Sequence, residues 1–166
     1  MDDSIRQLLE DPQVFHYKQY WLKVPIGSAE DTLLSIFSFG TYKDSITHKI
    51  KLNDLMKQKL QKLTILSLVC DNNNDRDNNI PYSIFLQECE IKDVSILERY
   101  LIELQPLVRC RIDQVSQTVN IIKCLDCRDI YCHEKPLLKL NHLPITKDDL
   151  IKSLEQWRSK LQDDIS

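Results

Sequence analysis

The amino-acid sequence predicts a mainly helical α+β fold with N-terminal helices, a small helix-and-hairpin subdomain and a last helix. Over most of the chain the apolar residues recur at steps of three and four, which is the period of a helix face. Two short segments, near residues 110 and 120, instead show the apolar and β-branched pattern of strands. Only 2 of the 166 residues are glycine, which leaves few sharp turns and also favours helices. We expect these three parts to span residues 1–70, 80–125 and 146–163.

The first part contains a helix with clear start and stop signals. Ser28 is a suitable N-cap, and Gly40 follows the last apolar residue at the place where a helix often ends. An aromatic-rich segment precedes this helix, and aromatic side chains of this kind are usually buried. Four rings are therefore expected in the core: Phe15, Tyr17, Tyr20 and Trp21.

A longer helix is predicted between Asn53 and Val69. Its apolar residues lie three or four positions apart, which places them on one face. The predicted face consists of Leu55, Met56, Leu60, Leu63, Leu66 and Val69, with Ile65 and Leu68 between them.

Two shorter helices follow. Pro81 suits the first turn of a helix, because its missing N–H would have no partner there. From this helix we expect three side chains to face inward: Ile84, Phe85 and Cys89. Asp93 or Ser95 is a suitable N-cap for the next helix, which ends before Pro106. Its apolar residues are Ile96, Tyr100, Leu101 and Leu104.

Two strands come next. Val108, Cys110 and Ile112 alternate with charged residues, and Val119 and Ile121 belong to a return strand. The connection lacks glycine, so we do not expect a tight two-residue turn. Helix, helix, helix and hairpin is the order of elements in a winged helix.

Composition bounds the possible functions. With 42% hydrophobic and 28% charged residues, the chain has the usage of a globular protein. No apolar run approaches 20 residues, so no membrane contact is expected, and the acidic N-terminus does not resemble a signal peptide. Its 6 cysteines are therefore expected to stay reduced, in the cytoplasm and nucleus. The net charge of −3 gives no general attraction to nucleic acid.

The sequence contains no recognisable catalytic motif. The 4 histidines form no HExxH motif, and no serine lies in a GxSxG elbow. We therefore expect a protein that is not an enzyme and that has no catalytic residues and no cofactor.

One cluster of cysteine and histidine residues is a candidate metal site. Cys124, Cys127, Cys132 and His133 have the spacing C-x2-C-x4-C-H. Structural zinc sites usually combine two ligand pairs separated by a longer loop, whereas Cys132 and His133 are adjacent and point in different directions. We expect no metal here, and Cys124 and Cys127 as small buried residues.

Several segments resemble the PCI module of the COP-nine signalosome, most closely its subunits seven and nine. The matching motifs are LTILSL at 63–68, IPYS at 80–83 before a short helix, and a short strand ending in RID at 111–113. CLDCRDI at 124–130 matches the family position where the chain leaves the wing. The opening LEDPQVFHYKQYW and the tryptophan-bearing tail are most similar to the small ninth subunits of budding-yeast-type complexes.

This resemblance implies a role. Signalosomes remove the Nedd8/Rub1 modifier from cullins with a zinc metalloprotease subunit, and nothing in this chain resembles that subunit's metal motif. The resemblance therefore implies a scaffold subunit whose partners are other PCI subunits and, indirectly, cullin-based ubiquitin ligases. Related PCI subunits of the proteasome lid or of the translation initiation complex are an alternative, although those chains are usually much longer.

Two surfaces are the candidate partner-binding sites. The first is the hairpin, because an exposed strand edge pairs readily with another chain and PCI subunits join through such edges. Its candidate residues are Val108, Cys110, Ile112, Val119 and Ile121. The second is the tail, where the apolar residues step by four, three and four, like a coiled-coil seam. These are Leu150, Leu154, Trp157 and Leu161. The alternative is that the tail helix packs back on its own domain.

A winged-helix protein can also bind nucleic acid. The helix that would enter the major groove carries Glu98 and Glu103, and both carboxylates would repel phosphates. Arg109, Arg111 and Lys123 on the hairpin are the favourable feature. The sequence therefore favours protein partners over nucleic acid.

Overall fold

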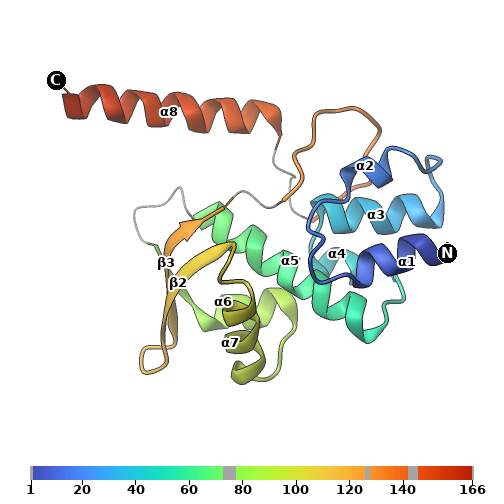
Figure 1. Ribbon diagram of the computed structural model, residues 1–166, viewed down its shortest axis with the longest axis horizontal. Helices are drawn as coiled ribbons and strands as arrows, with labels where there is room; N and C mark the ends of the chain where they lie inside the picture. The colour runs from blue at the N-terminus through green and yellow to red at the C-terminus, as the bar shows by residue number, and fades with distance from the viewer. Residues whose placement is uncertain (1, 73–77, 126–127, 142–145, 166) are drawn as a thin grey trace.

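The computed structural model describes residues 2–72, 78–125, 128–141 and 146–165. Helices dominate it, and a small antiparallel sheet lies beside them (Figure 1). In chain order the elements are α1 (Asp3–Glu10), α2 (Lys18–Trp21), α3 (Ala29–Phe39), α4 (Tyr42–Thr47), α5 (Asp54–Asn72), β1 (Asn79–Pro81), α6 (Tyr82–Cys89), α7 (Val94–Glu103), β2 (Val108–Asp113), β3 (Thr118–Cys124) and α8 (Lys147–Ile165). The predicted mainly helical α+β fold with a last, separate helix is confirmed.

The N-terminal helices α1 to α4 enclose an aromatic core. The Ser28 hydroxyl accepts a hydrogen bond from the backbone N–H of Asp31 and caps α3, as predicted. Tyr17 and Trp21 are fully buried and meet Phe37 and Phe39 edge to face. Tyr20 is exposed, so the prediction that all four rings lie in the core is wrong for this residue.

Helix α5 is the central helix of the fold, and it lies between the N-terminal helices and the sheet (Figure 1). The predicted face is buried at five of its positions: Met56, Leu60, Leu63, Leu66 and Val69. The prediction is wrong for Leu55, which is 55% exposed. Leu55 is the second residue of α5, and consecutive residues on a helix point about 100° apart, so the burial of Met56 does not bring Leu55 into the core.

Helices α6 and α7 pack beside α5. Pro81 is the N-cap of α6 rather than part of its first turn. Phe85 and Cys89 are buried as predicted, whereas Ile84 is 39% exposed, because the helix turns this side chain to the outer face. The Asp93 carboxylate accepts from the Ser95 N–H and caps α7.

The buried amide of Gln61 ties these two helices to α5. Its Nε2 donates to the carbonyl of Cys89 at 2.9 Å, and its Oε1 accepts from the Tyr100 hydroxyl at 3.2 Å. Polar groups buried among apolar side chains are stable only when they are paired in this way.

The sheet has the strand order β1-β3-β2, and both neighbouring pairs are antiparallel. Ile112 lies opposite Val119, and a bulge between Arg109 and Cys110 shifts the register further along. The sequence did not predict β1, because Asn79, Ile80 and Pro81 are too short a segment to show alternation. Within the described residues, β1 and β2 are the two edges of the sheet.

After β3 the chain returns to the N-terminal helices through residues 128–141 (Figure 1). Arg128 donates to the carbonyl of Gly40, and the Asp129 carboxylate accepts from the backbone N–H of Tyr17. Lys135 is buried, forms an ion pair with Asp31, and also donates to two backbone carbonyls. The sequence assigned residues 126–145 to none of the three predicted parts, yet this return segment joins the sheet side of the molecule to the N-terminal helices.

Candidate partner-binding surfaces

Helix α8 begins at a reciprocal cap. The Asp149 N–H donates to the Thr146 hydroxyl at 3.2 Å, and the Asp149 carboxylate accepts from the N–H of Thr146 at 3.1 Å. These hydrogen bonds lower the pKa of Asp149 below its ordinary value, so the carboxylate is charged at neutral pH and favours the helix N-terminus. Thr146 also forms an isolated bridge with Tyr131, which attaches the start of α8 to the return segment. The start of the helix is therefore well defined by local chemistry.

The rest of α8 extends away from the body of the protein (Figure 1). No residue of this helix is buried. Along the predicted seam Leu150 is half-buried, whereas Leu154 is 61% and Trp157 is 65% exposed. Leu161 is 45% exposed. In the described structure the tail therefore does not pack back on its own domain.

Two further apolar side chains widen this surface. Ile151 is 42% and Ile165 is 86% exposed. Ile151 precedes Leu154 by three positions and Ile165 follows Leu161 by four, so both lie close to the seam on the helix surface. The strict four-three-four pattern left them out, although spacing to the seam residues would have found them. We call the six residues together the α8 seam: Leu150, Ile151, Leu154, Trp157, Leu161 and Ile165.

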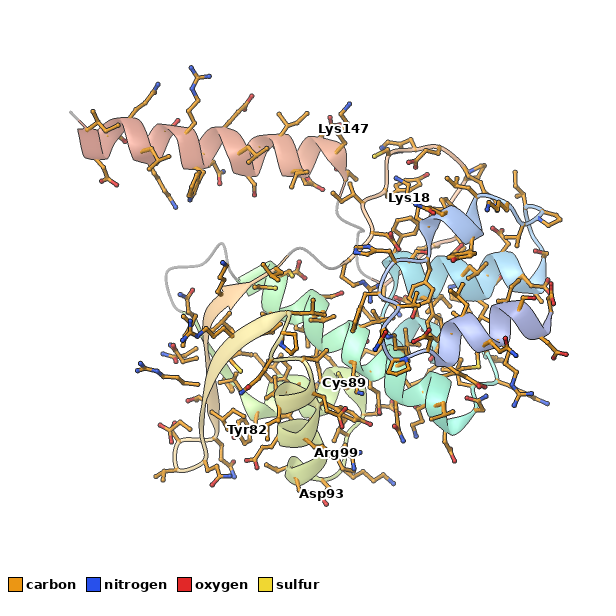
Figure 2. The ribbon with its side chains drawn as sticks, in the orientation of Figure 1. Lys18, Tyr82, Cys89, Asp93, Arg99 and Lys147 are labelled. Carbon is orange, nitrogen blue, oxygen red and sulfur yellow. The ribbon has the colours of Figure 1, made fainter. Side chains whose placement is uncertain are left out.

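The other face of α8 is charged. Lys152 and Glu155 lie on the face away from the seam, Arg158 and Lys160 flank the seam, and all four are exposed. Figure 2 shows side chains projecting from the helix beyond Lys147. A helix with an apolar stripe and a charged remainder gains stability when the stripe is covered. The α8 seam is thus a surface that this chain leaves uncovered.

The hairpin residues that the sequence selected as partner-binding lie differently. The side chains of Val108, Val119 and Ile121 are buried in the protein's own core. Cys110 and Ile112 are half-buried, and burial raises the pKa of the Cys110 thiol. These five side chains pack inward, so a partner at the hairpin would pair with the backbone of the β2 edge and contact the residues on its outer face.

The outer face of β2 carries two arginines, with Asp113 at the end of the strand. Arg109 and Arg111 are exposed, and together with Ile122 and Gln105 they line a shallow depression next to the β2 edge. Ile122 is 48% exposed. Charged residues on an edge strand oppose indiscriminate pairing, and here they favour a partner with acidic groups beside its own strand.

The helix that would enter a nucleic-acid groove is α7, and its carboxylates have partners within the same chain. Glu98 accepts hydrogen bonds from the Tyr82 hydroxyl and from Gln114, and Glu103 forms an ion pair with Lys62. Burial and the Glu98 carboxylate raise the pKa of Tyr82 to about 12, so its hydroxyl stays a donor at neutral pH. Figure 2 shows Tyr82, Asp93 and Arg99 together at this end of the molecule. Two acidic groups fixed on α7 make this face poorly suited to phosphates.

The cysteine and histidine cluster is spread out. Cys127 lies outside the described residues. Cys132 is exposed, and the His133 ring lies against Tyr131, with 4.7 Å between ring centroids. Among the residues that the structure describes, no group of three or more His, Cys, Asp and Glu side chains is arranged to hold a metal ion. None of the described helices is both long and apolar enough to cross a membrane.

The fold and these surfaces define a mainly helical, PCI-like α+β chain whose exposed seam and strand edge are suited to binding other proteins. Sequence comparison then identifies its relatives. The chain is 38% identical over 165 residues to COP9 signalosome complex subunit 9 of Saccharomyces cerevisiae, covering 99% of this chain and 98% of that protein. It is 34% identical over 154 residues to subunit 9 of Eremothecium gossypii, covering 92% and 91%.

A second group of relatives carries a different subunit number. The chain is 35% identical over 111 residues to COP9 signalosome complex subunit 7 of Drosophila melanogaster, covering 61% of this chain and 38% of that protein. No family model matches the chain. The chain belongs to the family of COP9 signalosome complex subunit 9, and the predicted family is confirmed.

Proposed function

We propose that this protein is a non-catalytic scaffold subunit of a COP9 signalosome. The observation that carries the proposal is the α8 seam, a stripe of apolar side chains on a helix with no buried residue. A protein that leaves Leu154 and Trp157 exposed in water gains free energy when another chain covers them. The names of its relatives supply the identity of the complex.

The scaffold role uses two separate surfaces. The α8 seam inserts into a bundle of helices from other subunits, in which Trp157 is the largest anchor. The β2 edge joins a neighbouring PCI subunit by strand addition, and Arg109 and Arg111 select an acidic surface beside it. Because the two surfaces lie on different parts of the chain, one subunit can hold two neighbours at once.

Through these contacts the subunit supports removal of the Nedd8/Rub1 modifier from cullins by the complex. The catalysis belongs to another subunit, and this chain contributes to assembly. Cullin-based ubiquitin ligases are therefore indirect partners. We place the protein in the cytoplasm and nucleus, where such ligases act.

The proposal is tested by purifying the protein from its own cells. The affinity tag belongs at the N-terminus, because α8 and its seam are at the other end of the chain. The proposal expects signalosome subunits in the purified material. Recovery of nucleic acid without other subunits would support a winged-helix nucleic-acid-binding protein, and recovery of proteasome-lid or initiation-complex subunits would support a different PCI assembly.

A second test measures function in the cell. Deletion of the gene is expected to leave cullins over-modified, detected as a larger fraction of the slower-migrating cullin band on an immunoblot. Re-expression of the full chain restores the normal band pattern, whereas a chain ending before Thr146 does not. A deletion strain with normal cullin modification would contradict the proposal.

A further inference from the structure

Two cysteine side chains from distant parts of the sequence meet where α5 ends. Cys70 lies near the end of α5 and Cys124 is the last residue of β3, and their Sγ atoms are 2.9 Å apart. They are 54 positions apart in the sequence, so this contact exists only because of the fold. Both carry thiols rather than a disulfide, and both are half-buried.

Neighbouring residues hold each of the two cysteines in position. Val69, next to Cys70, is fully buried and fixes the end of α5 against the core. Cys124 lies opposite Val108 in the sheet, and the following N–H of Leu125 donates to the carbonyl of Leu107. A disulfide has a sulfur–sulfur distance of about 2.0 Å, so the two sulfurs need to approach by only about another 0.9 Å.

The remaining described cysteines are in other environments. Cys89 is completely buried, and burial raises its thiol pKa to about 12, which keeps it protonated and unreactive. Cys110 faces the core beside β3, and Cys132 is exposed on the return segment with its sulfur near the carbonyl of Ile130. Among the described residues, Cys70 and Cys124 are the cysteines whose sulfurs contact each other.

We propose that Cys70 and Cys124 form a peroxide-sensitive thiol pair, a modification site at which oxidation links α5 to β3. One thiol, as its thiolate, attacks hydrogen peroxide and is oxidised to a sulfenic acid, while the peroxide O–O bond breaks and one water is released. The second thiol then attacks the sulfenic sulfur. The sulfur–sulfur bond forms as the S–O bond breaks, and a second water leaves. Two thiols and one peroxide thus give one disulfide and two waters.

The consequence of oxidation follows from the positions of the two residues. The disulfide closes a loop of about 54 residues that contains α6, α7 and the whole sheet. Closing so long a loop restricts the unfolded chain, and it stabilises the native state when the bond forms without strain. In a reducing compartment such a bond is transient, which suits a response to peroxide. This inference concerns the isolated chain and does not rest on the proposed function.

The test is peptide mapping of the full-length protein before and after addition of hydrogen peroxide. Trypsin cleaves after Lys62, Arg76, Lys123 and Arg128, which releases Cys70 in peptide 63–76 and Cys124 in peptide 124–128. The proposal expects these peptides as one linked species after oxidation, reversed by dithiothreitol. We also expect the Tm of the oxidised protein to rise by roughly 10 °C, from the loop-closure effect for a chain of this size.

Three single variants identify the sulfurs, because peptide 124–128 also contains Cys127. Cys124→Ser is expected to lower the yield of the linked species at least tenfold, whereas Cys127→Ser and the matched exposed control Cys132→Ser leave it within twofold. Loss of the linked species in Cys127→Ser with retention in Cys124→Ser would overturn the assignment. So would an oxidised wild-type protein in which peptide 63–76 stays unlinked, a result that does not depend on any variant being folded.

Discussion

Helices α5 and α8 are each 19 residues long, and both carry apolar residues at steps of three and four. Their surroundings are opposite. Helix α5 buries Leu60, Leu63 and Leu66 completely, while α8 buries no residue at all. Apolar spacing alone therefore shows that a helix has a face to cover, but it does not show whether the same chain covers it.

The difference lies in what surrounds each helix. The N-terminal helices, α6 and the sheet all contact α5, so its face is covered on folding. Thr146 and Tyr131 attach only the start of α8 to the return segment. In the described structure no residue of its seam is buried. We therefore expect alanine substitutions of apolar residues to have different effects in the two helices. They should lower stability in α5 and weaken partner binding in α8.

The largest effect is expected from removing the anchors of the α8 seam. Replacing Leu154 and Trp157 together with alanine should weaken binding to the signalosome about a thousandfold or more, because truncating a buried Leu or Trp costs ~2–5 kcal/mol in a packed site. The Tm of the free protein should not change, since neither side chain is buried there. Pull-down and thermal unfolding on the same double variant measure both quantities.

The matched control keeps the helix but changes its charged face. Replacing Lys152 and Glu155 with alanine removes two exposed side chains of the same helix and should leave binding nearly unchanged. A double variant of Leu154 and Trp157 that is destabilised but still binds would show that the seam packs on its own domain in solution.

The opposite result is expected for α5. Leu63→Ala should lower the free energy of unfolding by ~2–5 kcal/mol, because it removes a fully buried side chain and leaves a cavity. Leu55→Ala on the same helix removes an exposed leucine and should change stability by less than about 0.5 kcal/mol. Urea unfolding measures both. Equal losses for the two variants would mean that α5 is not packed as described.

The contrast also shows how much the sequence alone could establish. The buried face of α5 apart from Leu55, and four of the six residues of the α8 seam, were predicted, because periodicity is a local property of a helix. Leu55 and Ile84 were placed wrongly, since each is adjacent to a truly buried residue, Met56 or Phe85. Alternation in the hairpin showed that each strand has two faces, but not that Val108 and Val119 face the protein's own core.

The return segment could not be predicted at all. Its attachment consists of side chains that reach backbone groups far away in the sequence, as when Asp129 binds the N–H of Tyr17, 112 positions apart. Lys135 is buried in the same way through Asp31 and two carbonyls. Such contacts leave no period in the sequence, so residues 128–141 carried no signal of their role.

A smaller effect is expected from the buried amine of Lys59 on α5. Its Nζ donates to the carbonyl of Pro12 and lies 3.9 Å from the centre of the Phe15 ring. Burial lowers its pKa to about 8, against an ordinary value near 10.4 for an unfolded chain. Below pH 8 the Lys59 amine is protonated in both the folded and the unfolded chain. Burial of its charge then lowers the stability of the folded state by up to about 3 kcal/mol.

Between pH 8 and about pH 10.4 the unfolded state binds more protons than the folded state, so the contribution of Lys59 to stability rises with pH. The free energy of unfolding of Lys59→Met should therefore exceed that of the wild type most at pH 7, and this difference should shrink towards pH 10. Urea unfolding of both proteins at pH 7, 8.5 and 10 measures the difference. Lys57→Met, an exposed lysine of the same helix, controls for loss of one positive charge. An advantage that stays constant with pH would show that the Lys59 amine is hydrated.

The smallest effects are expected from substitutions of two N-cap residues, one at α3 in the body of the protein and one at α8. The Ser28 hydroxyl caps α3, which lies in the core, and the Thr146 hydroxyl caps α8, which does not. Ser28→Ala should lower the free energy of unfolding by ~1 kcal/mol, because the Asp31 N–H loses its partner, and Ser28→Asn should recover most of it. Thr146→Ala should leave the Tm of the body unchanged and reduce only the helical circular-dichroism signal, since fraying of α8 exposes nothing that was buried. If Thr146→Ala lowers the Tm as much as Ser28→Ala does, α8 unfolds together with the body, and the two regions are one cooperative unit rather than a core with an uncovered arm.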